Sequence, residues 1–104
     1  MTHWTYVTEE SGIPLREGRR VICGGREVAL FHTPDGWFAV DNRCPHKQGP
    51  LADGITSGKT VYCPLHGWNI DLTSGKALAG GEGCVKTYPV KVEGGKVFVD
   101  LAGP

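Results

Sequence analysis

The sequence predicts an all-β fold: an antiparallel β-sandwich or barrel that forms a base and carries a small insertion. Runs of β-branched and aromatic residues alternate with turns, for which 16 glycines and 7 prolines are available. No window of about eleven residues or more repeats its apolar positions at the helical period, and no internal repeat is visible. A chain of 104 residues has room for one hydrophobic core. We therefore expect a single domain over residues 1–104.

The first part of the base is predicted from four short β runs and the turns between them. Residues 9–18 contain three turn residues, two Gly and one Pro, so they are expected to form a loop with room for one helical turn. A Gly-Gly pair at 24–25 favours a hairpin, and Thr-Pro-Asp-Gly at 33–36 is typical of a second turn. The runs expected to be strands are residues 4–8, 20–23, 27–31 and 37–41.

The insertion is expected at about residues 43–70. Residues 46–54 have the composition of an irregular segment, whereas residues 60–62 suit a short strand. Residues 67–72 alternate apolar and polar side chains before a turn at 73–76. These patterns predict a small sheet that carries two loops at its tip.

The C-terminal segment predicts a β-hairpin. Residues 85–92 and 96–101 are β-rich and are joined by Gly94-Gly95, a two-residue link typical of a tight turn. Pro89 within the first run indicates a sheet edge or a bulge, because proline cannot donate to a strand ladder. The base is thus expected at about residues 1–42 and 71–104.

Four candidate metal ligands lie in two short motifs, Cys44-Pro45-His46 and Cys63-Pro64-Leu65-His66, with sixteen residues between the motifs. A structural zinc site is one interpretation, but its ligand pairs are usually spaced C-x2–4-C and H-x3–5-H. One residue between Cys44 and His46 is a tight reach for two ligands of one tetrahedral ion. The spacing is easier to satisfy if each motif gives its Cys to one iron and its His to a neighbouring iron, as in a Rieske [2Fe–2S] cluster. We favour the cluster, with zinc as the alternative.

The other cysteines and histidines are given no function. Two disulfides are the alternative for four cysteines, but a reducing compartment and the histidines of the motifs argue against them. Cys23 and Cys84 are each expected to be a free thiol, at least half buried, that behaves as a small apolar residue. His3 and His32 are expected to be surface histidines.

Charge and hydropathy argue against two classes of partner. Lys+Arg and Asp+Glu both total 11, which gives no field that would attract nucleic acid or an anionic membrane. The N-terminal MTHWTYVTEE has no charged segment followed by an apolar run, and no stretch of about 18 apolar residues follows. We expect a soluble, cytoplasmic protein with no nucleic acid and no membrane as partner.

Three segments extend the two motifs: CPHKQGPLADGI at 44–55, CPLHGWNIDLTSGKA at 63–77 and GEGCVKTYPV at 81–90. With them the whole chain resembles Rieske ferredoxins and, more narrowly, the small subunit of the assimilatory NAD(P)H-dependent nitrite reductase. KQGPL at 47–51 and GCVKTYP at 83–89 favour the nitrite reductase subunit. Ferredoxins of ring-hydroxylating dioxygenase systems share the C-P-x-H-G and K-T-Y-P elements, so they are the alternative.

The resemblance implies that Cys44 and Cys63 bind one iron of a [2Fe–2S] cluster and that His46 and His66 bind the other. The His-bound iron takes the electron, and the histidine edges face solvent. No catalytic residue is implied, because the protein passes single electrons and has no substrate site of its own. The implied partner is a nitrite reductase large subunit with flavin, a [4Fe–4S] cluster and sirohaem; the alternative is an oxygenase with its ferredoxin reductase. A zinc- or cluster-bearing interaction module without redox function is a third interpretation.

The resemblance also bears on the redox potential. High-potential members of the family have an extra cysteine in each ligand loop, joined in a disulfide, and a Ser and a Tyr after the second His that donate hydrogen bonds to sulfur. Here Gly49 and Leu65 occupy the places of the two cysteines, and Trp68 and Ile70 those of the Ser and the Tyr. We therefore expect a potential at the low end of the Rieske range.

Overall fold

The computed structural model describes residues 4–23, 25–42, 51–62, 69–78 and 84–101. These residues form eleven strands and two short 3₁₀ helices. In chain order the elements are β1 (Trp4–Glu9), η1 (Glu10–Gly12), β2 (Glu17–Cys23), β3 (Arg26–Thr33), β4 (Gly36–Asp41), η2 (Leu51–Asp53), β5 (Ile55–Ser57), β6 (Thr60–Tyr62), β7 (Asn69–Asp71), β8 (Ala77–Leu78), β9 (Thr87–Tyr88), β10 (Val90–Glu93) and β11 (Lys96–Asp100). Within these ranges no helix has the length and apolar character needed to cross a membrane.

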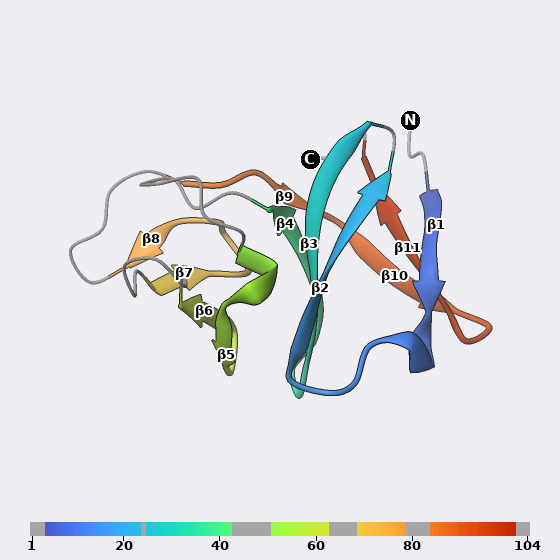
Figure 1. Cartoon of the computed structure of the whole chain (residues 1–104), viewed down its shortest axis with the longest axis horizontal. Helices are drawn as coiled ribbons and strands as arrows, with labels where there is room; N and C mark the ends of the chain where they lie inside the picture. The colour runs from blue at the N-terminus through green and yellow to red at the C-terminus, as the bar shows by residue number, and fades with distance from the viewer. Residues whose placement is uncertain (1–3, 24, 43–50, 63–68, 79–83, 102–104) are drawn as a thin grey trace.

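The strands form three antiparallel sheets, which we call the terminal, central and small sheets. The terminal sheet has the order β1–β11–β10, the central sheet β2–β3–β4–β9 and the small sheet β5–β6–β7–β8. In Figure 1 the small sheet lies at one end of the molecule, the terminal sheet at the other and the central sheet between them. The molecule is elongated in this direction, with principal extents of 39, 27 and 19 Å.

Strand β3 explains why the protein has two apolar cores. Residues 28–31 are all buried, and successive side chains of a strand point to opposite faces of its sheet. Val28 and Leu30 join the core between the central and terminal sheets. Ala29 and Phe31 join the second core, between the central and small sheets. The unbroken apolar run of β3 is therefore that of a strand covered on both faces.

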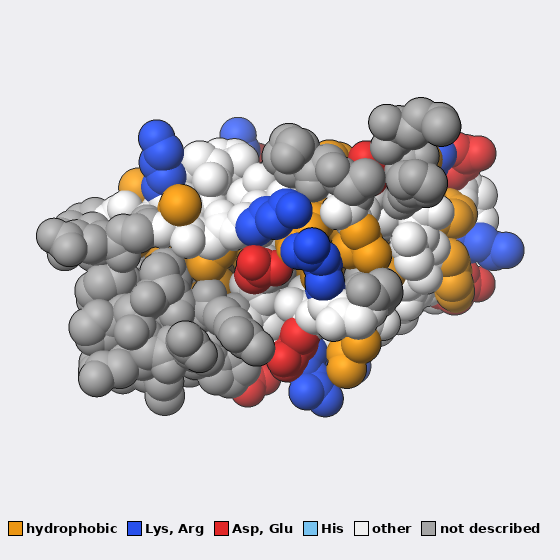
Figure 2. Space-filling model, turned by 90° about the horizontal axis from the view of Figure 1, so that it is seen from above, with side chains coloured by type: hydrophobic (Ala, Val, Ile, Leu, Met, Phe, Trp, Pro, Cys, Tyr) orange, Lys and Arg blue, Asp and Glu red, His pale blue; other side chains and the backbone are white. Residues whose placement is uncertain are grey.

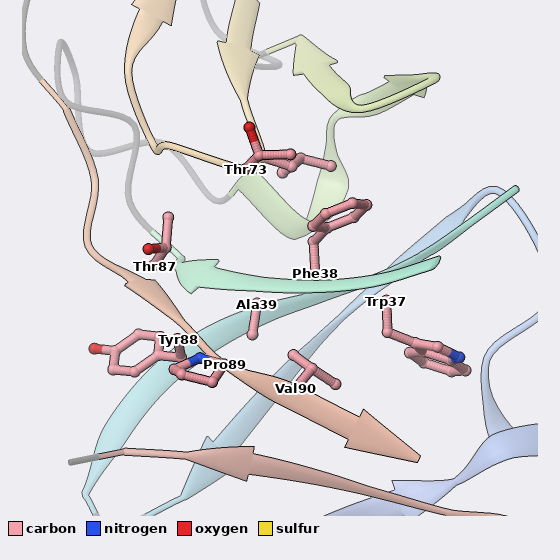
Figure 3. A pocket seen from close by; sticks show the side chains of 9 residues that line it. Trp37, Phe38, Ala39, Thr73, Thr87, Tyr88, Pro89 and Val90 are labelled. Atoms are coloured by element: carbon pink, nitrogen blue, oxygen red, sulfur yellow. The ribbon is translucent and has the colours of Figure 1, made fainter. Parts of the chain in front are cut away.

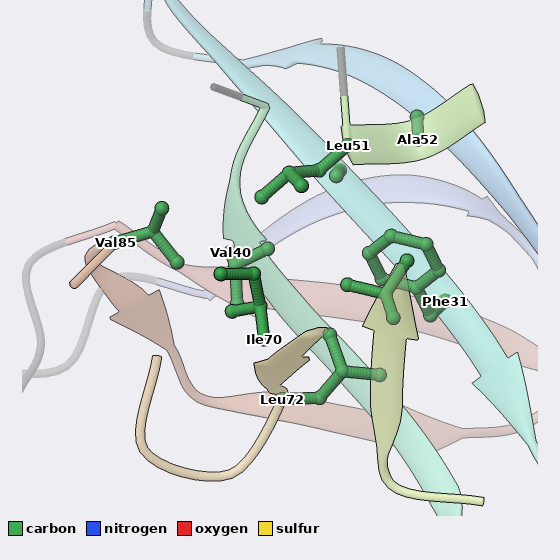
Figure 4. Close-up of a cluster of buried hydrophobic side chains, with 9 residues drawn as sticks. Phe31, Val40, Leu51, Ala52, Ile70, Leu72 and Val85 are labelled. Carbon is green, nitrogen blue, oxygen red and sulfur yellow. The ribbon is translucent and has the colours of Figure 1, made fainter. Parts of the chain in front are cut away.

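The second core fixes the small sheet to the central sheet (Figure 4). It combines residues of β3, β4, η2, β6 and β7 with two residues that lie outside the strands, Leu72 and Val85. Its buried members are Ala29, Phe31, Val40, Leu51, Ala52, Val61, Ile70, Leu72 and Val85. Because η2, β6 and β7 all contribute, this core also fixes where the segments 43–50 and 63–68 join the rest of the chain.

At Pro89 the chain passes from one sheet to another. β9 pairs with β4 in the central sheet, whereas β10 pairs with β11 in the terminal sheet. The edge or bulge expected at Pro89 is thus a break between two short strands. The predicted hairpin at Gly94-Gly95, directly after β10, is confirmed: Glu93 pairs with Lys96, and both glycines have positive φ angles, of 61° and 78°.

The predicted all-β antiparallel fold is confirmed, with differences in the bounds of its elements. β2 begins at Glu17 and β3 runs to Thr33, so both strands are longer than expected. The short strands β5, β8 and β9 were not predicted from the sequence as separate elements. The small sheet reaches Leu78, beyond the expected limit of the insertion near residue 70. The division into base and insertion otherwise remains a prediction.

Charges of both signs are mixed on the face of the molecule shown in Figure 2. Over the described part of this face, Lys and Arg side chains alternate with Asp and Glu side chains. This distribution fits the formal net charge of +0 and gives that face no region of a single sign.

Candidate metal centre

The four predicted ligands, Cys44, His46, Cys63 and His66, lie outside the described residues. The structure instead defines the stems, meaning the described residues from which the segments 43–50 and 63–68 leave and to which they return. The ligand assignment therefore remains a prediction, and the stems show whether the two motifs start close together.

The stem of segment 63–68 is a pair of neighbouring strands. β6 ends at Tyr62 and β7 begins at Asn69, and these two residues are cross-strand partners. Cys63 and His66 thus belong to a six-residue connection whose two ends are held at the spacing of adjacent antiparallel strands.

The stem of segment 43–50 is closed by a side chain. β4 ends at Asp41, and the following residue, Asn42, is buried with 3% of its surface exposed. The backbone N–H of Ala52 in η2 donates a hydrogen bond of 2.7 Å to Asn42 Oδ1. The motif Cys44-Pro45-His46 therefore lies in a connection whose ends are joined directly.

The two stems lie against each other. Leu51 and Ala52 pack with Val61 and Ile70 in the second core (Figure 4). Gly54 comes so close to β6 that a β-carbon at this position would overlap the carbonyl oxygen of Tyr62. Each connection carries one Cys and one His, so adjacent stems allow all four side chains to reach a common centre.

We expect the substitution Gly54→Ala to destabilise the protein by about 1–3 kcal/mol, because the added methyl group must displace backbone of β6. Chemical denaturation of the two proteins measures the difference. A Gly54→Ala variant as stable as the wild type would contradict the close approach of Gly54 to β6.

The donor set fits an iron–sulfur cluster. Two thiolates and two imidazoles, one of each from two adjacent stems, match the ligand set of a [2Fe–2S] centre in which His replaces Cys on one iron. Elsewhere in the described ranges, no three His, Cys, Asp or Glu side chains lie close enough together to hold a metal ion. Those ranges therefore offer no competing zinc site.

Comparison with known proteins decides the family. A family model described as a Rieske-like [2Fe-2S] domain matches residues 3–100. The chain belongs to this family. The ferredoxin component of the naphthalene 1,2-dioxygenase system of Pseudomonas aeruginosa is 38% identical over 91 residues, which cover 86% of this chain and 88% of the relative.

Two solved structures of the Rieske fold resemble the whole chain. The ferredoxin of Sphingomonas yanoikuyae B1 superposes with a TM-score of 0.85 at 29% identity, over 94% of this chain and 98% of the ferredoxin. A protein of Mycobacterium tuberculosis described as an NADH-dependent nitrite reductase small subunit superposes with a TM-score of 0.87 at 26% identity, over 95% of both chains. The Rieske-type fold is confirmed, and the similarity extends to both kinds of protein that the sequence resembled.

This Rieske domain therefore carries a [2Fe–2S] cluster and acts in electron transfer. When bound, a cluster of this type accepts and releases one electron at a time. Zinc, the alternative left open by the ligand spacing, is not supported by this family membership. Cys44, His46, Cys63 and His66 are the residues of this chain that would hold the cluster.

The other cysteines and histidines, to which the sequence analysis gave no function, differ in how far they match their predicted burial. Cys84 is a free thiol but is exposed, so the expectation that it is at least half buried is wrong. Of Cys23 the structure describes the backbone at the end of β2, and His3 lies outside the described residues. His32 is only partly exposed: its ring stacks on Trp37 at 4.1 Å, and its Nδ1 lies 2.8 Å from the carbonyl oxygen of Ile13. His32 therefore lies partly at the surface, and its ring is held in place by Trp37 and the Ile13 carbonyl.

A polar network at the end of β4 was not predicted. Tyr88 donates a hydrogen bond of 2.6 Å to Asp41 Oδ1, and Arg26 Nη1 donates to the Tyr88 hydroxyl at 3.3 Å. On the next residue, the Asn42 amide donates to Glu27 Oε1 at 3.1 Å. Consecutive Asp and Asn residues at the end of an apolar strand, with one residue between them and a ligand motif, are the signal that could have revealed it.

Burial raises the pKa of the Tyr88 phenol, and its hydrogen bond to Asp41 acts in the same direction, while Arg26 partly opposes it. The folded protein therefore binds this proton more tightly than the unfolded chain, whose tyrosines titrate at about pH 10. Stability from Tyr88 is fully present below that pH and is lost as the pH rises through the folded pKa. We expect the free energy of unfolding to fall less steeply between pH 9 and 11 in Tyr88→Phe than in the wild type, as measured by denaturation. Equal slopes would contradict this assignment.

One surface pocket of about 280 Å³ lies where the pairing of β4 with β9 ends (Figure 3). Its lining is largely apolar and contains no His, Cys, Asp, Glu, Lys or Arg side chain. The lining residues are Trp37, Phe38, Ala39, Leu72, Thr73, Thr87, Tyr88, Pro89 and Val90. Tyr88 donates its hydroxyl hydrogen to Asp41. The pocket thus brings together no pair of acid–base groups, and we assign it no catalytic role.

Proposed function

We propose that this chain is the electron-transfer small subunit of an assimilatory NAD(P)H-dependent nitrite reductase in the cytoplasm. Its partner would be a large subunit with flavin and sirohaem, to which it passes or relays single electrons. The observation that carries the proposal is the pair of segments KQGPL at 47–51 and GCVKTYP at 83–89, which resemble this subunit beyond the ligand motifs themselves. The superposition with a nitrite reductase small subunit over 95% of both chains supports it.

A second candidate has an observation of its own. The ferredoxin component of the naphthalene 1,2-dioxygenase system from Pseudomonas aeruginosa is 38% identical to this chain over 91 residues. A ferredoxin that donates electrons to an oxygenase, and receives them from a ferredoxin reductase, is therefore the alternative. Both candidates use the same cluster chemistry and differ only in the partner.

The architecture suits either partner. The small sheet, from which the segment 63–68 leaves and to which it returns, lies at one end of the elongated molecule, away from the terminal sheet (Figure 1). A large protein can approach that end without contacting the terminal sheet. The fold itself therefore does not discriminate between the candidates, and the test must use the partner.

The test reconstitutes the partner from the same organism. The nitrite reductase large subunit is assayed for NAD(P)H-dependent nitrite reduction with no addition, with the cluster-loaded protein, and with the Cys63→Ser variant, which lacks one predicted ligand. We expect the loaded protein alone to raise the rate. If it does not, but replaces the native ferredoxin in a ring-hydroxylating dioxygenase assay, the second candidate is correct. Activity in neither assay contradicts both candidates.

A further inference from the structure

Asn42 lies between the central sheet and the first ligand motif, and its side chain is almost completely buried, with 3% of its surface exposed. Its amide makes two hydrogen bonds of opposite direction. Nδ2 donates to the carboxylate oxygen Glu27 Oε1 at 3.1 Å, and Oδ1 accepts from the backbone N–H of Ala52 at 2.7 Å. The backbone N–H of Asn42 also donates to the carbonyl oxygen of Glu27 at 3.1 Å.

The two ends of this arrangement belong to different parts of the fold. Glu27 is in β3, and its carboxylate also receives Arg20 Nη1 of β2 at 3.2 Å, so this side is fixed to the central sheet. Ala52 is in η2, the first described element after the segment 43–50, and packs in the second core. The amide of Asn42 therefore joins the start of the segment 43–50 to its end and ties both to β3.

We propose that Asn42 is a positioning residue for the [2Fe–2S] cluster, whose amide holds the stem of the segment with Cys44 and His46 closed and so retains the cluster. A closed stem limits the conformations of the two predicted ligands before they bind. This lowers the conformational entropy that is lost on cluster binding. If the stem opens, the two ends of the segment 43–50 are no longer joined, and the predicted ligands Cys44 and His46 lose that constraint. The bond to the Glu27 carboxylate strengthens the closed state, because hydrogen bonds to charged groups are stronger than those between neutral groups.

If Asn42 only stabilised the fold, the loss of any comparable buried hydrogen bond would speed cluster loss equally. Thr33 provides the matched control for this comparison. Thr33 is also buried, with 2% of its surface exposed, and lies in the same hairpin of β3 and β4 but at the opposite end. Its hydroxyl donates to the carbonyl oxygen of Gly36 at 2.9 Å and accepts from the N–H of Asp35 at 3.1 Å. Thr33→Val removes both bonds far from the ligand motifs.

The test measures the rate at which the full-length, cluster-loaded protein loses its visible absorbance and Rieske EPR signal to an iron chelator. The free energy of unfolding is measured in parallel. We expect Asn42→Ala to lose the cluster roughly tenfold faster than the wild type, the factor expected from a buried hydrogen bond. Thr33→Val should lose the cluster at nearly the wild-type rate. If both variants accelerate cluster loss in proportion to their loss of stability, Asn42 is merely structural and the proposal is wrong.

A rescue experiment keeps the proposal testable if Asn42→Ala fails to fold. Asn42→Asp retains the acceptor for the Ala52 N–H but places a carboxylate against that of Glu27, so we expect fast cluster loss. Combining it with Glu27→Gln reverses the polarity of the pair, because the new amide at position 27 can donate to the new carboxylate at position 42. The double variant should regain slow cluster loss. Cluster loss as fast as in the Asn42→Asp single variant would overturn the proposal.

Discussion

Replacing His66 by alanine is expected to abolish the cluster and to remove much of the stability of the fold. The four predicted ligands are expected to act as a unit, since cluster binding and folding are thermodynamically linked when the ligands come together only in the folded chain. A chain of 104 residues buries a modest share of its surface, so it depends more than a large protein does on a centre that joins two connections. Iron and sulfide analysis and the EPR spectrum measure the loss of the cluster, and chemical denaturation measures the loss of stability.

The control for this substitution is Cys84→Ser. Cys84 is a free, exposed thiol, and it belongs to neither ligand motif. Its substitution should leave iron content, spectrum and stability almost unchanged, since surface substitutions usually alter stability by less than about 0.5 kcal/mol. A His66→Ala variant with a normal Rieske spectrum would show that the ligand assignment is wrong.

The strands of the base could be predicted because their residues meet the requirements of the sheet directly. Within the predicted strand 27–31, residues 28–31 are all apolar, and β3 is indeed covered on both faces, with Ala29 and Phe31 on one side and Val28 and Leu30 on the other. The turn at Gly94-Gly95 requires positive φ angles at both positions, which glycine adopts without strain. Local chemistry and tertiary packing point to the same structure in these segments.

The short strands of the small sheet could not be predicted in the same way. β5 and β8 have three and two residues, and neither length is enough to establish a pattern of alternation. They are strands because β6 and β7 lie between them and supply hydrogen-bonding partners. β9 likewise exists because the chain passes the edge of β4 before it turns into the terminal sheet at Pro89.

The candidate site was predicted from chemistry rather than from structure. Two Cys–Pro motifs with histidines specify a metal centre wherever their loops lie, so the four ligands could be named from the sequence. Asn42 was missed because its importance depends on the position of Ala52, which is ten residues away and is brought back by the fold. The burial of Cys84 was overestimated for a related reason: free cysteine is usually buried, and only the path of the chain shows that this one is exposed.

The midpoint potential of the cluster is expected between about −150 and −50 mV near pH 7, the low end of the Rieske range. Hydrogen bonds to the cluster sulfurs raise the potential, because they stabilise the extra negative charge of the reduced state. The resemblance relates four positions, Gly49, Leu65, Trp68 and Ile70, to these donors or to the disulfide. The structure describes one of them, Ile70. Ile70 is fully buried among apolar side chains of the second core and has no group that could donate. Gly49 and Leu65 supply no cysteine for a disulfide.

Protein-film voltammetry near pH 7 measures this potential, and a midpoint above about +100 mV would contradict the argument, because the upper part of the range requires donors that this chain lacks. The substitution Trp68→Ser introduces a hydroxyl at the position that the resemblance assigns to the donating serine, so it is expected to raise the potential. Trp68→Ala is the matched control: it removes the same indole without adding a donor. A rise in potential found in Trp68→Ser but not in Trp68→Ala is then due to the hydroxyl. Equal shifts in both variants would show that exposure of the cluster to water changes the potential and that hydrogen bonding at this position does not.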